Sequence, residues 1–403
     1  MKITRRRLGR LTRLVLVPAV TLVAPVLVGS CGVLGSPQSS RVSGPAIPAR
    51  LSDAEFWRMV TQFSEPGGYF RSDNFVSNET AFQFVIPSLQ KQTPRGGVYF
   101  GVGPDQNFTY LVAMQPKIAF IVDIRRQNML HHLLYKALVE MSADRAEFLS
   151  RLFSRPRPPG LNSQSTAEQL FTAYAMVEPD SARLRKNLAE VGEWLTTRHG
   201  FGLTDEDEAA IVYVYNAFFV EGPDLTYSFG RGRRMPYGYG GRGMPSYADL
   251  LVQTDGEGEN RSYLGSEANY RILKELETNN LIVPLVGDFG GDKAIRSAGQ
   301  YVRERGATVT VFYTSNVEQY LFQANGLENG GWEKFFTNVG TLPIDATSTF
   351  IRAVPNGFGA FPSNPTPGPG PRLATLLSSI GEVTKAFSEG RIRSYNDVIQ
   401  MSR

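Results

Sequence analysis

The sequence contains one cysteine and three histidines in 403 residues, and this scarcity excludes several kinds of protein. A single cysteine cannot form an internal disulfide, so the stability of the folded chain must come from a buried core. Three histidines without an HExxH motif or a cysteine pair make a poor metal-binding set, and no metal is predicted. The chain also lacks a G-x-S-x-G motif and a P-loop, which argues against two common hydrolase architectures.

Long apolar runs are scarce too, and the longest lies near the N-terminus, at Leu14–Gly29. This run has 16 residues, fewer than the ~20 that a membrane-spanning helix needs, and it contains Pro18 and Pro25. It follows a basic start formed by Lys2, Arg5, Arg6, Arg7, Arg10 and Arg13. The pattern predicts an export signal over residues 1–30 that is cleaved rather than retained.

The end of this signal predicts a lipid anchor. The tetrad Val28-Gly29-Ser30-Cys31 resembles a bacterial lipobox, so Cys31 is the predicted lipidation site. The protein would then be exported and anchored in a bacterial membrane, facing the periplasm or the exterior. An ordinary signal peptide with an incidental cysteine is the alternative. The stretch "TRRRLGRL" also resembles a twin-arginine signal, so the export route stays open.

The excess of basic residues belongs to the signal. Residues 1–30 hold six of the 42 Lys and Arg residues and none of the 38 Asp and Glu residues. The mature chain therefore carries 36 basic against 38 acidic residues, a net charge of −2. No basic surface is implied, and no nucleic-acid partner is expected.

The remaining chain divides by composition. Residues 31–50 are rich in Pro, Ser and Gly and predict a flexible tether. Residues 51–355 form the predicted body, with a large helical insertion over about 127–245. A Pro/Gly-rich linker is expected over 356–372 and packed C-terminal helices over 373–403. The body begins with a helix capped by Ser52, and a second helix is expected near Glu79 with Ser77 as its cap.

The stretch "GGVYFGVGPDQNFTYL" combines a strand, a glycine turn and a helix start. Gly101 and Gly103 permit a tight turn, and Asp105 is expected to cap the helix that begins at Gln106. The strand at Lys117–Arg126 contains Asp123, 20 residues after Gly103. A glycine turn followed at this spacing by an acid at a strand end is the nucleotide-binding pattern, with the acid on the ribose hydroxyls.

Two later apolar runs, Leu281–Phe289 and Ala307–Ser315, are separated by an amphipathic helix. This order predicts a right-handed parallel crossover and an α/β fold with a Rossmann-like parallel sheet. Ligands of such sheets bind beyond the carboxyl ends of the strands. The expected substrate or lid residues are Tyr69, Arg71, Asp73, Asn74, Asn78, Glu79, Tyr313 and Asn316. The alternative is that the polar loop residues only cap helices and brace turns.

A resemblance to a known family rests on the blocks "GGYFRSDNFVSNE", "GVGPDQN", "DIRRQN" and "SNVEQYL". With them, roughly residues 50–355 look like the class I S-adenosylmethionine-dependent methyltransferase fold. The chain is more closely similar to an uncharacterised bacterial family that is methyltransferase-like and without established activity. Tyr99 stands where that fold usually has an acid, and Asp105 replaces the third glycine. The cofactor-binding residues that the resemblance and the turn imply are Gly101, Gly103, Asp105, Asn107, Asp123 and Arg125.

These features predict a methyltransferase-like protein of unknown activity that binds a nucleotide-type ligand, with S-adenosylmethionine as the implied cofactor. A non-catalytic binding module is the alternative, and an active methyltransferase with Asp288 as its base is a second one. His131 and His132 are expected to be structural. The glycine-rich segment Phe229–Ser246 is interpreted as a mobile surface loop, with an ordering lid or an RNA-binding-like segment as the alternatives.

Overall fold

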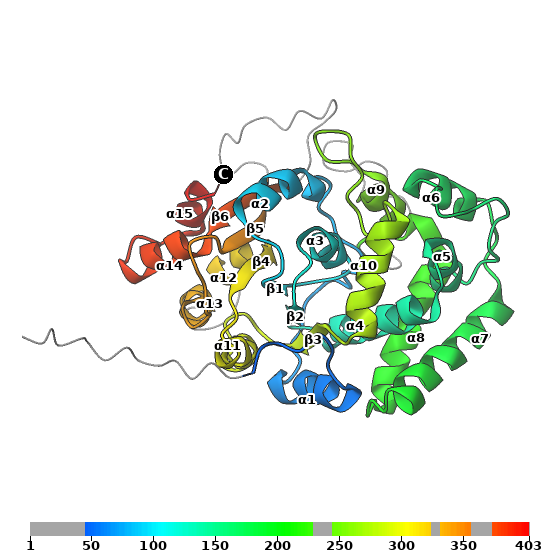
Figure 1. The fold of residues 1–403 in the computed structure, drawn as a ribbon, viewed down its shortest axis with the longest axis horizontal. Helices are drawn as coiled ribbons and strands as arrows, with labels where there is room; N and C mark the ends of the chain where they lie inside the picture. Colours follow the sequence, from blue (N-terminus) through cyan, green and yellow to red (C-terminus); the bar gives the residue numbers. More distant parts are fainter. Residues whose placement is uncertain (1–44, 229–243, 324–330, 356–372, 403) are drawn as a thin grey trace, which may run out of the picture. The chain divides into compact units, whose positions relative to one another are not determined.

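A computed structural model describes residues 45–228, 244–323, 331–355 and 373–402, which fall in one compact unit, Ser43–Arg403. Its centre is a six-stranded sheet in the order β3-β2-β1-β4-β5-β6 (Figure 1). The strands are β1 Val98–Gly101, β2 Ile118–Asp123, β3 Ile282–Val286, β4 Val309–Ser315, β5 Thr349–Pro355 and β6 Leu373–Ser379. The first five are parallel and β6 is antiparallel to β5. The fold is therefore α/β and Rossmann-like, as predicted, with the strand order reversing between β1 and β4.

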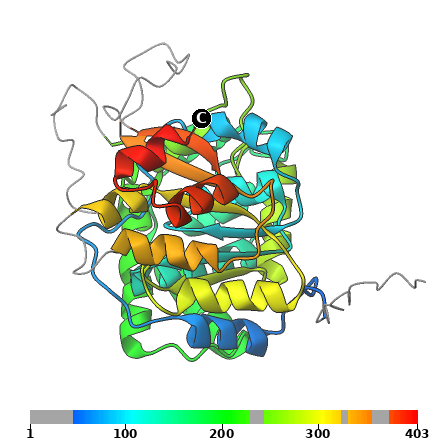
Figure 2. The ribbon, with the colours of Figure 1, turned by 90° about the vertical axis from the view of Figure 1, so that its left-hand side faces the viewer.

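Helices cover both faces of the sheet. Figure 2 shows α11 (Ala294–Glu304) and α13 (Gly331–Gly340) in front of the strands. The opposite face is covered by α3 (Gln106–Met114), α4 (Arg126–Met141) and α10 (Glu267–Thr278) (Figure 1). Because both faces are covered, β1 and β2 are buried along their whole length and consist almost entirely of apolar residues.

The crossover from β2 to β3 contains the helical insertion. After α4 come α5 (Arg145–Leu152), α6 (Ala167–Ala175), α7 (Ser181–Gly192), η2 (Glu193–Arg198), α8 (Asp205–Glu221), η3 (Gly222–Asp224) and α9 (Tyr247–Val252), before α10 returns to the sheet. The insertion thus continues past residue 245, where the sequence pattern ended it. The segment 229–243 lies outside the described residues.

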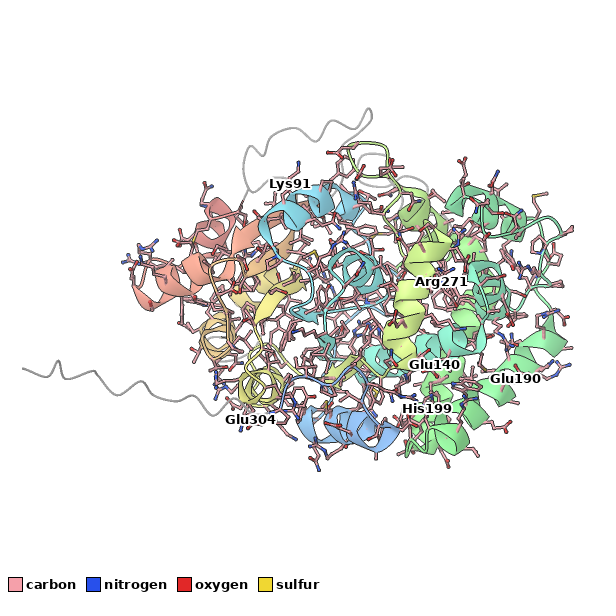
Figure 3. The ribbon with its side chains drawn as sticks, in the orientation of Figure 1. Lys91, Glu140, Glu190, His199, Arg271 and Glu304 are labelled. Atoms are coloured by element: carbon pink, nitrogen blue, oxygen red, sulfur yellow. The ribbon has the colours of Figure 1, made fainter. Side chains whose placement is uncertain are left out.

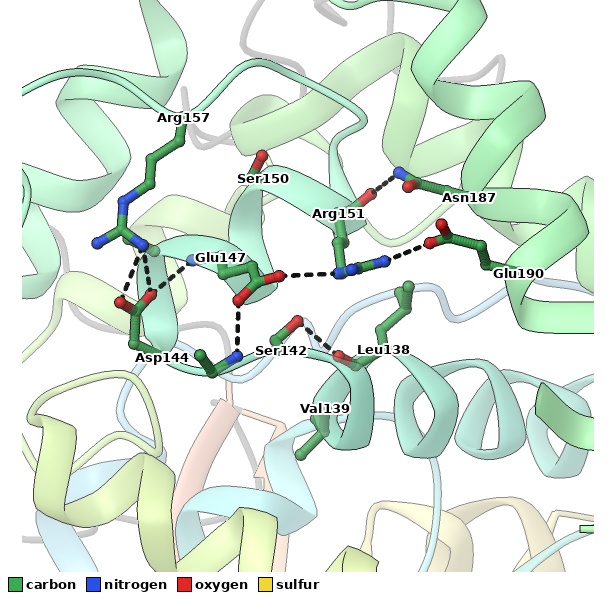
Figure 4. A network of polar contacts seen from close by, with 12 residues as sticks. Leu138, Val139, Ser142, Asp144, Glu147, Ser150, Arg151, Arg157, Asn187 and Glu190 are labelled. Carbon is green, nitrogen blue, oxygen red and sulfur yellow. Dashed lines mark hydrogen bonds and ion pairs between the residues drawn. The ribbon is translucent and has the colours of Figure 1, made fainter. Parts of the chain in front are cut away.

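A polar network joins the insertion helices to one another (Figure 4). Arg151 of α5 donates to Glu147 one turn away and to Glu190 of α7. Arg157 donates to Asp144, which also caps α5 by accepting from the backbone N–H of Glu147. These side chains are partly exposed, so the network positions helices but contributes little stability per pair.

Among the described residues, two arginines are fully buried, and each organises a junction. Arg145 of α5 donates to the carbonyls of Ser163, Ser165 and Leu264 and to the carboxylate of Glu267. It thereby fixes the long loop between α5 and α6 against the start of α10.

The second buried arginine is Arg352 of β5, which pairs through Nε and Nη2 with both carboxylate oxygens of Glu318, in α12 (Val317–Phe322). Its Nη1 also donates to Ser378 of β6. Arg352 therefore links β5, β6 and α12 in the core beside the carboxyl end of β4.

A cluster of charged side chains also holds α1 (Asp53–Phe63) to the insertion. His199 lies with Nδ1 2.7 Å from Asp53 and Nε2 2.7 Å from Glu140 of α4. Figure 3 shows His199 and Glu140 side by side. Hydrogen bonds to His199 and Lys136 lower the pKa of Glu140 to about 2 against the opposing effect of burial. This cluster fixes the position of α1. The chain that leaves α1 then contacts the carboxyl end of β3 through Glu65.

Two predictions about helices are wrong. Residues 373–379 were expected to be helical, but they form β6, because their apolar side chains complete the sheet beside β5; α14 (Ile380–Ser388) and α15 (Tyr395–Gln400) follow. The helix expected near Glu79 begins later, as η1 (Phe82–Val85) and α2 (Ile86–Gln92). Ser77 accepts from the backbone N–H of Glu79, so it forms a turn instead of a helix cap. Ser52 does cap α1 as predicted.

Across the described residues, no helix combines the length and apolar character needed to span a bilayer. The predicted signal, Cys31 and most of the tether lie in residues 1–44, and the predicted linker is residues 356–372. All of these lie outside the described residues. The lipid anchor at Cys31 therefore stays a prediction.

Candidate functional site

A cavity of about 530 Å³ lies at the carboxyl ends of the parallel strands. It is lined by residues that follow β1 (Val102–Pro104), β2 (Asp123–Arg125), β3 (Gly287–Phe289) and β4 (Ser315–Val317). Its size falls within the range of about 300–1,000 Å³ that is typical of small-molecule sites. The cavity includes the point between β1 and β4 where the strand order reverses, which is where Rossmann-like sheets bind ligands.

The glycine turn after β1 is held from behind by one asparagine. Nδ2 of Asn107 donates to the carbonyls of Val102 (2.9 Å), Gly103 (3.2 Å) and Pro104 (2.7 Å), while Oδ1 accepts from the hydroxyl of Tyr99. Tyr99, the residue that replaces the usual acid, therefore takes part in bracing the turn.

Gly101 and Gly103 lack a side chain for two different structural reasons. A Cβ on Gly101 would lie 2.0 Å from Oδ1 of Asn107, so its absence makes room for the brace. Gly103 has φ +76°, and a Cβ there would meet nothing within 4 Å. Gly103 lines the cavity, so its backbone is open to a ligand. Gly101 and Asn107 do not line the cavity and act on a ligand only through the turn.

His132 of α4 supports the same turn. Its Nε2 donates to the carbonyl of Gly103 at 2.9 Å. Burial lowers the pKa of His132 to about 4, so the ring is neutral near pH 7 and its Nε2 carries the proton. The histidine predicted to be structural is thus part of the support of the site.

Asp105 was expected to cap α3, and it occupies the N-cap position without forming the expected side-chain bond. Its side chain makes no capping bond; it accepts a hydrogen bond of 3.0 Å from the hydroxyl of Tyr263. It does not line the cavity. Burial raises the pKa of Asp105 to about 7, against the lowering effect of the Tyr263 hydrogen bond. The carboxyl group that replaces the third glycine therefore lies outside the cavity lining.

The raised pKa of Asp105 predicts a pH dependence of stability. Between the ordinary value of 3.8 and about 7 the folded protein holds a proton that the unfolded chain has lost, so this group's contribution falls as pH rises through that window. Asp105→Asn keeps an acceptor for Tyr263 and removes the proton. We expect the free energy of unfolding to decline less from pH 4 to pH 8 than in the parent, by an amount on the order of 3 kcal/mol.

Urea unfolding at pH 4, 6 and 8 measures this difference. Asp397→Asn serves as the control, because Asp397 belongs to the capping box of α15 and hydrogen bonds from the backbone N–H groups of Arg393 and Ser394 lower its pKa. Its replacement should change the pH dependence in the opposite direction. Parallel curves for the parent and Asp105→Asn would mean that Asp105 ionises normally in the folded state.

Asp123, the predicted ribose-binding acid, lines the cavity but is already engaged with Arg125. Its Oδ1 accepts from the backbone N–H of Arg125 (2.9 Å) and from its Nε (3.0 Å), and Oδ2 accepts from Nη2 (2.9 Å). Each carboxylate oxygen accepts about two hydrogen bonds. One acceptor position therefore remains, on Oδ2. Asp123 can receive one ribose hydroxyl, where the sequence had predicted two hydrogen bonds.

The segment 65–79, here called the strap, passes across the carboxyl ends of the strands β3 and β2. The backbone N–H of Glu65 donates to Val286 of β3, and that of Gly68 donates to Ile124 after β2. Nη1 of Arg125 then donates to the carbonyl of Asp73. The strap thus follows the ends of β3 and β2 before it reaches Glu79. The cavity lining includes Tyr69, Phe70, Arg71, Asn74 and Ser77–Glu79 of the strap, so the segment predicted as a lid lies at the cavity.

Glu79 ends the strap as a fully buried carboxylate at the cavity wall. It accepts hydrogen bonds from Tyr313 (2.7 Å) and Ser315 (2.6 Å) at the end of β4, and from Gln106 (2.8 Å) of α3. Burial raises the pKa of Glu79, and the three hydrogen bonds oppose that shift. Ser315 has φ +51° beside a register shift in β4, which turns its hydroxyl toward Glu79.

Asp288 follows β3 and also lines the cavity. Its Oδ1 accepts from the backbone N–H of Gly290 at 2.8 Å. Burial and the nearby Glu65 raise the pKa of Asp288, while Gly290 and Lys334 oppose the shift. A carboxyl group with a raised pKa at a cavity wall has the character of a general base or acid.

The structure brings together most of the site residues predicted from the sequence. Those that line the cavity are Tyr69, Arg71, Asn74, Asn78, Glu79, Gly103, Asp123, Arg125, Asp288, Tyr313 and Asn316. Those that do not are Asp73, Gly101, Asp105 and Asn107. Asp73 instead accepts from the hydroxyl of Tyr213 of α8. Among the described residues, no group of three His, Cys, Asp or Glu side chains is placed to hold a metal ion.

Several lining residues were missed by the sequence reasoning. The aromatic ones among them are Tyr227, Phe289 and Tyr320; Phe70 belongs to the loop that was predicted to cover the site. Phe70 and Phe289 adjoin residues that were predicted, so the strand ends and the strap contained a usable signal. Tyr227 comes from the insertion, and nothing in its sequence neighbourhood indicates that it returns to the sheet edge.

Residues 74–374 of the sequence match a family model described as a domain of unknown function (DUF7790). The chain belongs to this family. The DUF7790 match contains all of the strand ends that line the cavity and begins within the strap, at Asn74. It confirms the membership in an uncharacterised family, and the matching family is not described as a methyltransferase. No curated protein matches the chain.

Proposed function

We propose that this DUF7790 chain binds a nucleoside-type ligand in the cavity at the carboxyl ends of β1–β4, as a methyltransferase-like protein with S-adenosylmethionine as the first ligand to test. The observation that supports it is the convergence of four strand ends on one cavity of suitable volume. The open backbone of Gly103 and the free acceptor position of Asp123 lie in that same lining.

The two positions at which the chain departs from the methyltransferase pattern, Tyr99 and Asp105, are compatible with such a ligand. Asp105 directs its carboxyl group toward Tyr263 instead of the cavity, so it does not repel a ligand carboxylate. Tyr99 supports the turn through Asn107, so the missing acid is replaced by a different brace. Both arrangements keep the turn in a shape that leaves the Gly103 backbone accessible.

Methyl transfer itself is a second candidate, favoured by Asp288. A raised pKa at the cavity wall suits a group that takes a proton from a nucleophile while the cofactor supplies the methyl group. Asp288 would act as the base. A non-catalytic binding module on the same scaffold is the alternative if no turnover accompanies binding.

Gly103→Val tests the ligand site. A branched side chain at φ +76° fills open space beside the turn, so we expect binding of S-adenosylmethionine to weaken at least tenfold, which is about 1.4 kcal/mol. Isothermal titration calorimetry on the exported chain without residues 1–30 measures the affinity. Gly390→Val is a matched control, because Gly390 has φ +68° and open space around its Cβ position but lies between α14 and α15.

Both variants should lose a similar amount of stability, on the order of 1–2 kcal/mol, because both force a branched residue into the left-handed region. Only Gly103→Val should lose affinity for S-adenosylmethionine. If the parent gives no heat with S-adenosylmethionine, its demethylated product or a dinucleotide at millimolar concentration, the nucleoside proposal fails. The turn would then be a structural connection in a binding module.

A further inference from the structure

We propose that the cavity selects a ligand carrying an organic positive charge, such as a sulfonium or quaternary ammonium group. The inference deepens the proposed function, on which its nucleoside arm rests, by naming the charge of the ligand. It is carried by the balance of charged and aromatic groups in the lining.

The first observation is a carboxylate without a cation. Glu79 is fully buried, and its hydrogen-bond donors are the neutral side chains of Gln106, Tyr313 and Ser315. No Lys, Arg or His side chain among the described residues forms an ion pair with it. Burial raises the pKa of Glu79, so a cation bound in the cavity would supply the missing partner and stabilise the ionised carboxylate.

The second carboxylate, Asp288, is bonded to a backbone N–H at Gly290. Its charged neighbours are Glu65 and Lys334, whose effects on it oppose each other. Asp288 and Glu79 lie on the two sides of the strand ends, one after β3 and the other beside β4. A cation in the cavity would therefore meet a carboxyl group on either side of it.

Neither of the two arginines in the lining pairs with these carboxyl groups. Arg125 is neutralised by its two-pronged pair with Asp123, and its Nη1 is used by the carbonyl of Asp73. Arg71 is exposed to solvent, where water and salt screen its charge. The buried part of the lining therefore offers two carboxyl groups without a cation paired to them.

Aromatic rings supply the remaining recognition. The lining contains Tyr69, Phe70, Tyr227, Phe289, Tyr313 and Tyr320. Phe70 of the strap meets Tyr320 of α12 edge-to-face, with centroids 5.3 Å apart. Ring faces attract cations, and several rings around one pocket are a known means of binding quaternary ammonium groups. The hydrogen bond from Tyr313 to Glu79 makes that ring more electron-rich and so a better partner for a cation.

The unpaired carboxyl groups of the lining argue against phosphorylated ligands. A phosphate group would approach Glu79 and Asp288 without a free buried cation to meet it. The expected ligand is thus a nucleoside with a cationic side chain and no phosphate, which narrows the nucleotide-type ligand predicted from the sequence.

Calorimetry with two matched ligand pairs tests the inference. The first pair is S-adenosylmethionine and S-adenosylhomocysteine, which differ by one methyl group and the sulfonium charge. The second pair is choline and 3,3-dimethyl-1-butanol, which have the same shape and differ in charge. We expect the charged member of each pair to bind about tenfold more tightly, and adenosine monophosphate to bind more weakly than either nucleoside.

Two variants locate the effect. Glu79→Gln should reduce the preference for the charged member of each pair at least threefold. Phe70→Leu should also reduce this preference, and it leaves the buried hydrogen bonds of Glu79 intact. Glu168→Gln, in a separate groove lined by Glu168 and Arg261, is the control and should leave the preference unchanged. Phe70→Leu keeps the test decisive if Glu79→Gln does not fold.

The outcomes separate the two proposals. Equal binding of both nucleosides, or tighter binding of the neutral one, overturns the charge inference and leaves the nucleoside site standing. A preference for choline without any nucleoside binding supports the charge inference and overturns the proposed function. Absence of binding by all four ligands overturns both.

Discussion

Arg352→Met is expected to lower the free energy of unfolding by about 3–5 kcal/mol. Arg352 and Glu318 are both buried and share a two-pronged ion pair between β5 and α12. Removing the arginine leaves the Glu318 carboxylate in the core without its cation, which is a far larger penalty than the pair's own net contribution. Urea unfolding followed by circular dichroism measures the loss.

The double variant Arg352→Met/Glu318→Leu distinguishes the unpaired charge from lost packing. Two apolar side chains of similar volume are expected to recover most of the stability. Arg391→Met is the surface control, because Arg391 and Glu389 form an exposed pair, and it should cost less than about 1 kcal/mol. A double variant as unstable as the single one would refute the argument from the buried charge.

Arg145→Met is the second substitution with a large expected effect. The guanidinium group is 1% exposed and is bonded to three backbone carbonyls and to Glu267. Each buried acceptor left without a partner costs about 1–3 kcal/mol, so a total loss of about 3 kcal/mol or more is expected. The loop at residues 156–166 should also become sensitive to protease, because Arg145 holds two of its carbonyls.

Arg157→Met is the matched control for this loop. Arg157 donates to Asp144 from a side chain that is 40% exposed, so its loss should cost less than about 1 kcal/mol and leave the protease pattern unchanged. Equal effects of the two substitutions would show that the buried acceptors of Arg145 contribute no more than a surface pair.

The sequence predicted the part of the fold whose signals are local. The apolar run and glycine turn at Val98–Gly103 and the strand that ends in Asp123 were all readable from neighbouring residues. The strands β3 and β4 were equally clear, because each is a continuous apolar run. Parallel strands place their carboxyl ends at one edge, so the position of the site followed from the same pattern.

The side-chain directions at the site depended on residues far away in the sequence. Asp105 turns away from the ligand site because Tyr263, at the far end of the insertion, offers its hydroxyl. Glu79 is buried because Tyr313 and Ser315 surround it. Only the pairing of Asp123 with Arg125, two residues apart, was within reach of a local argument.

The strands β5 and β6 were missed for a related reason. The residues Thr349–Pro355 include Arg352, and a charged residue argues against a buried strand when only the sequence is known. Its burial follows from its ion pair with Glu318. β6 has an irregular burial pattern and owes its conformation to pairing with β5. Both strands therefore depend on tertiary contacts that local propensity does not contain.

The central place of β1 has a consequence for how the chain is made. Val98 pairs on one side with Ile118, which is synthesised soon afterwards, and on the other with Val309, which follows the entire helical insertion. While the ribosome makes the insertion, one edge of β1 stays open, and an open apolar edge is a template for pairing with another chain. Incomplete chains that end before Val309 are thus the species most exposed to aggregation, and a chaperone that shields this edge would protect them until β4 emerges.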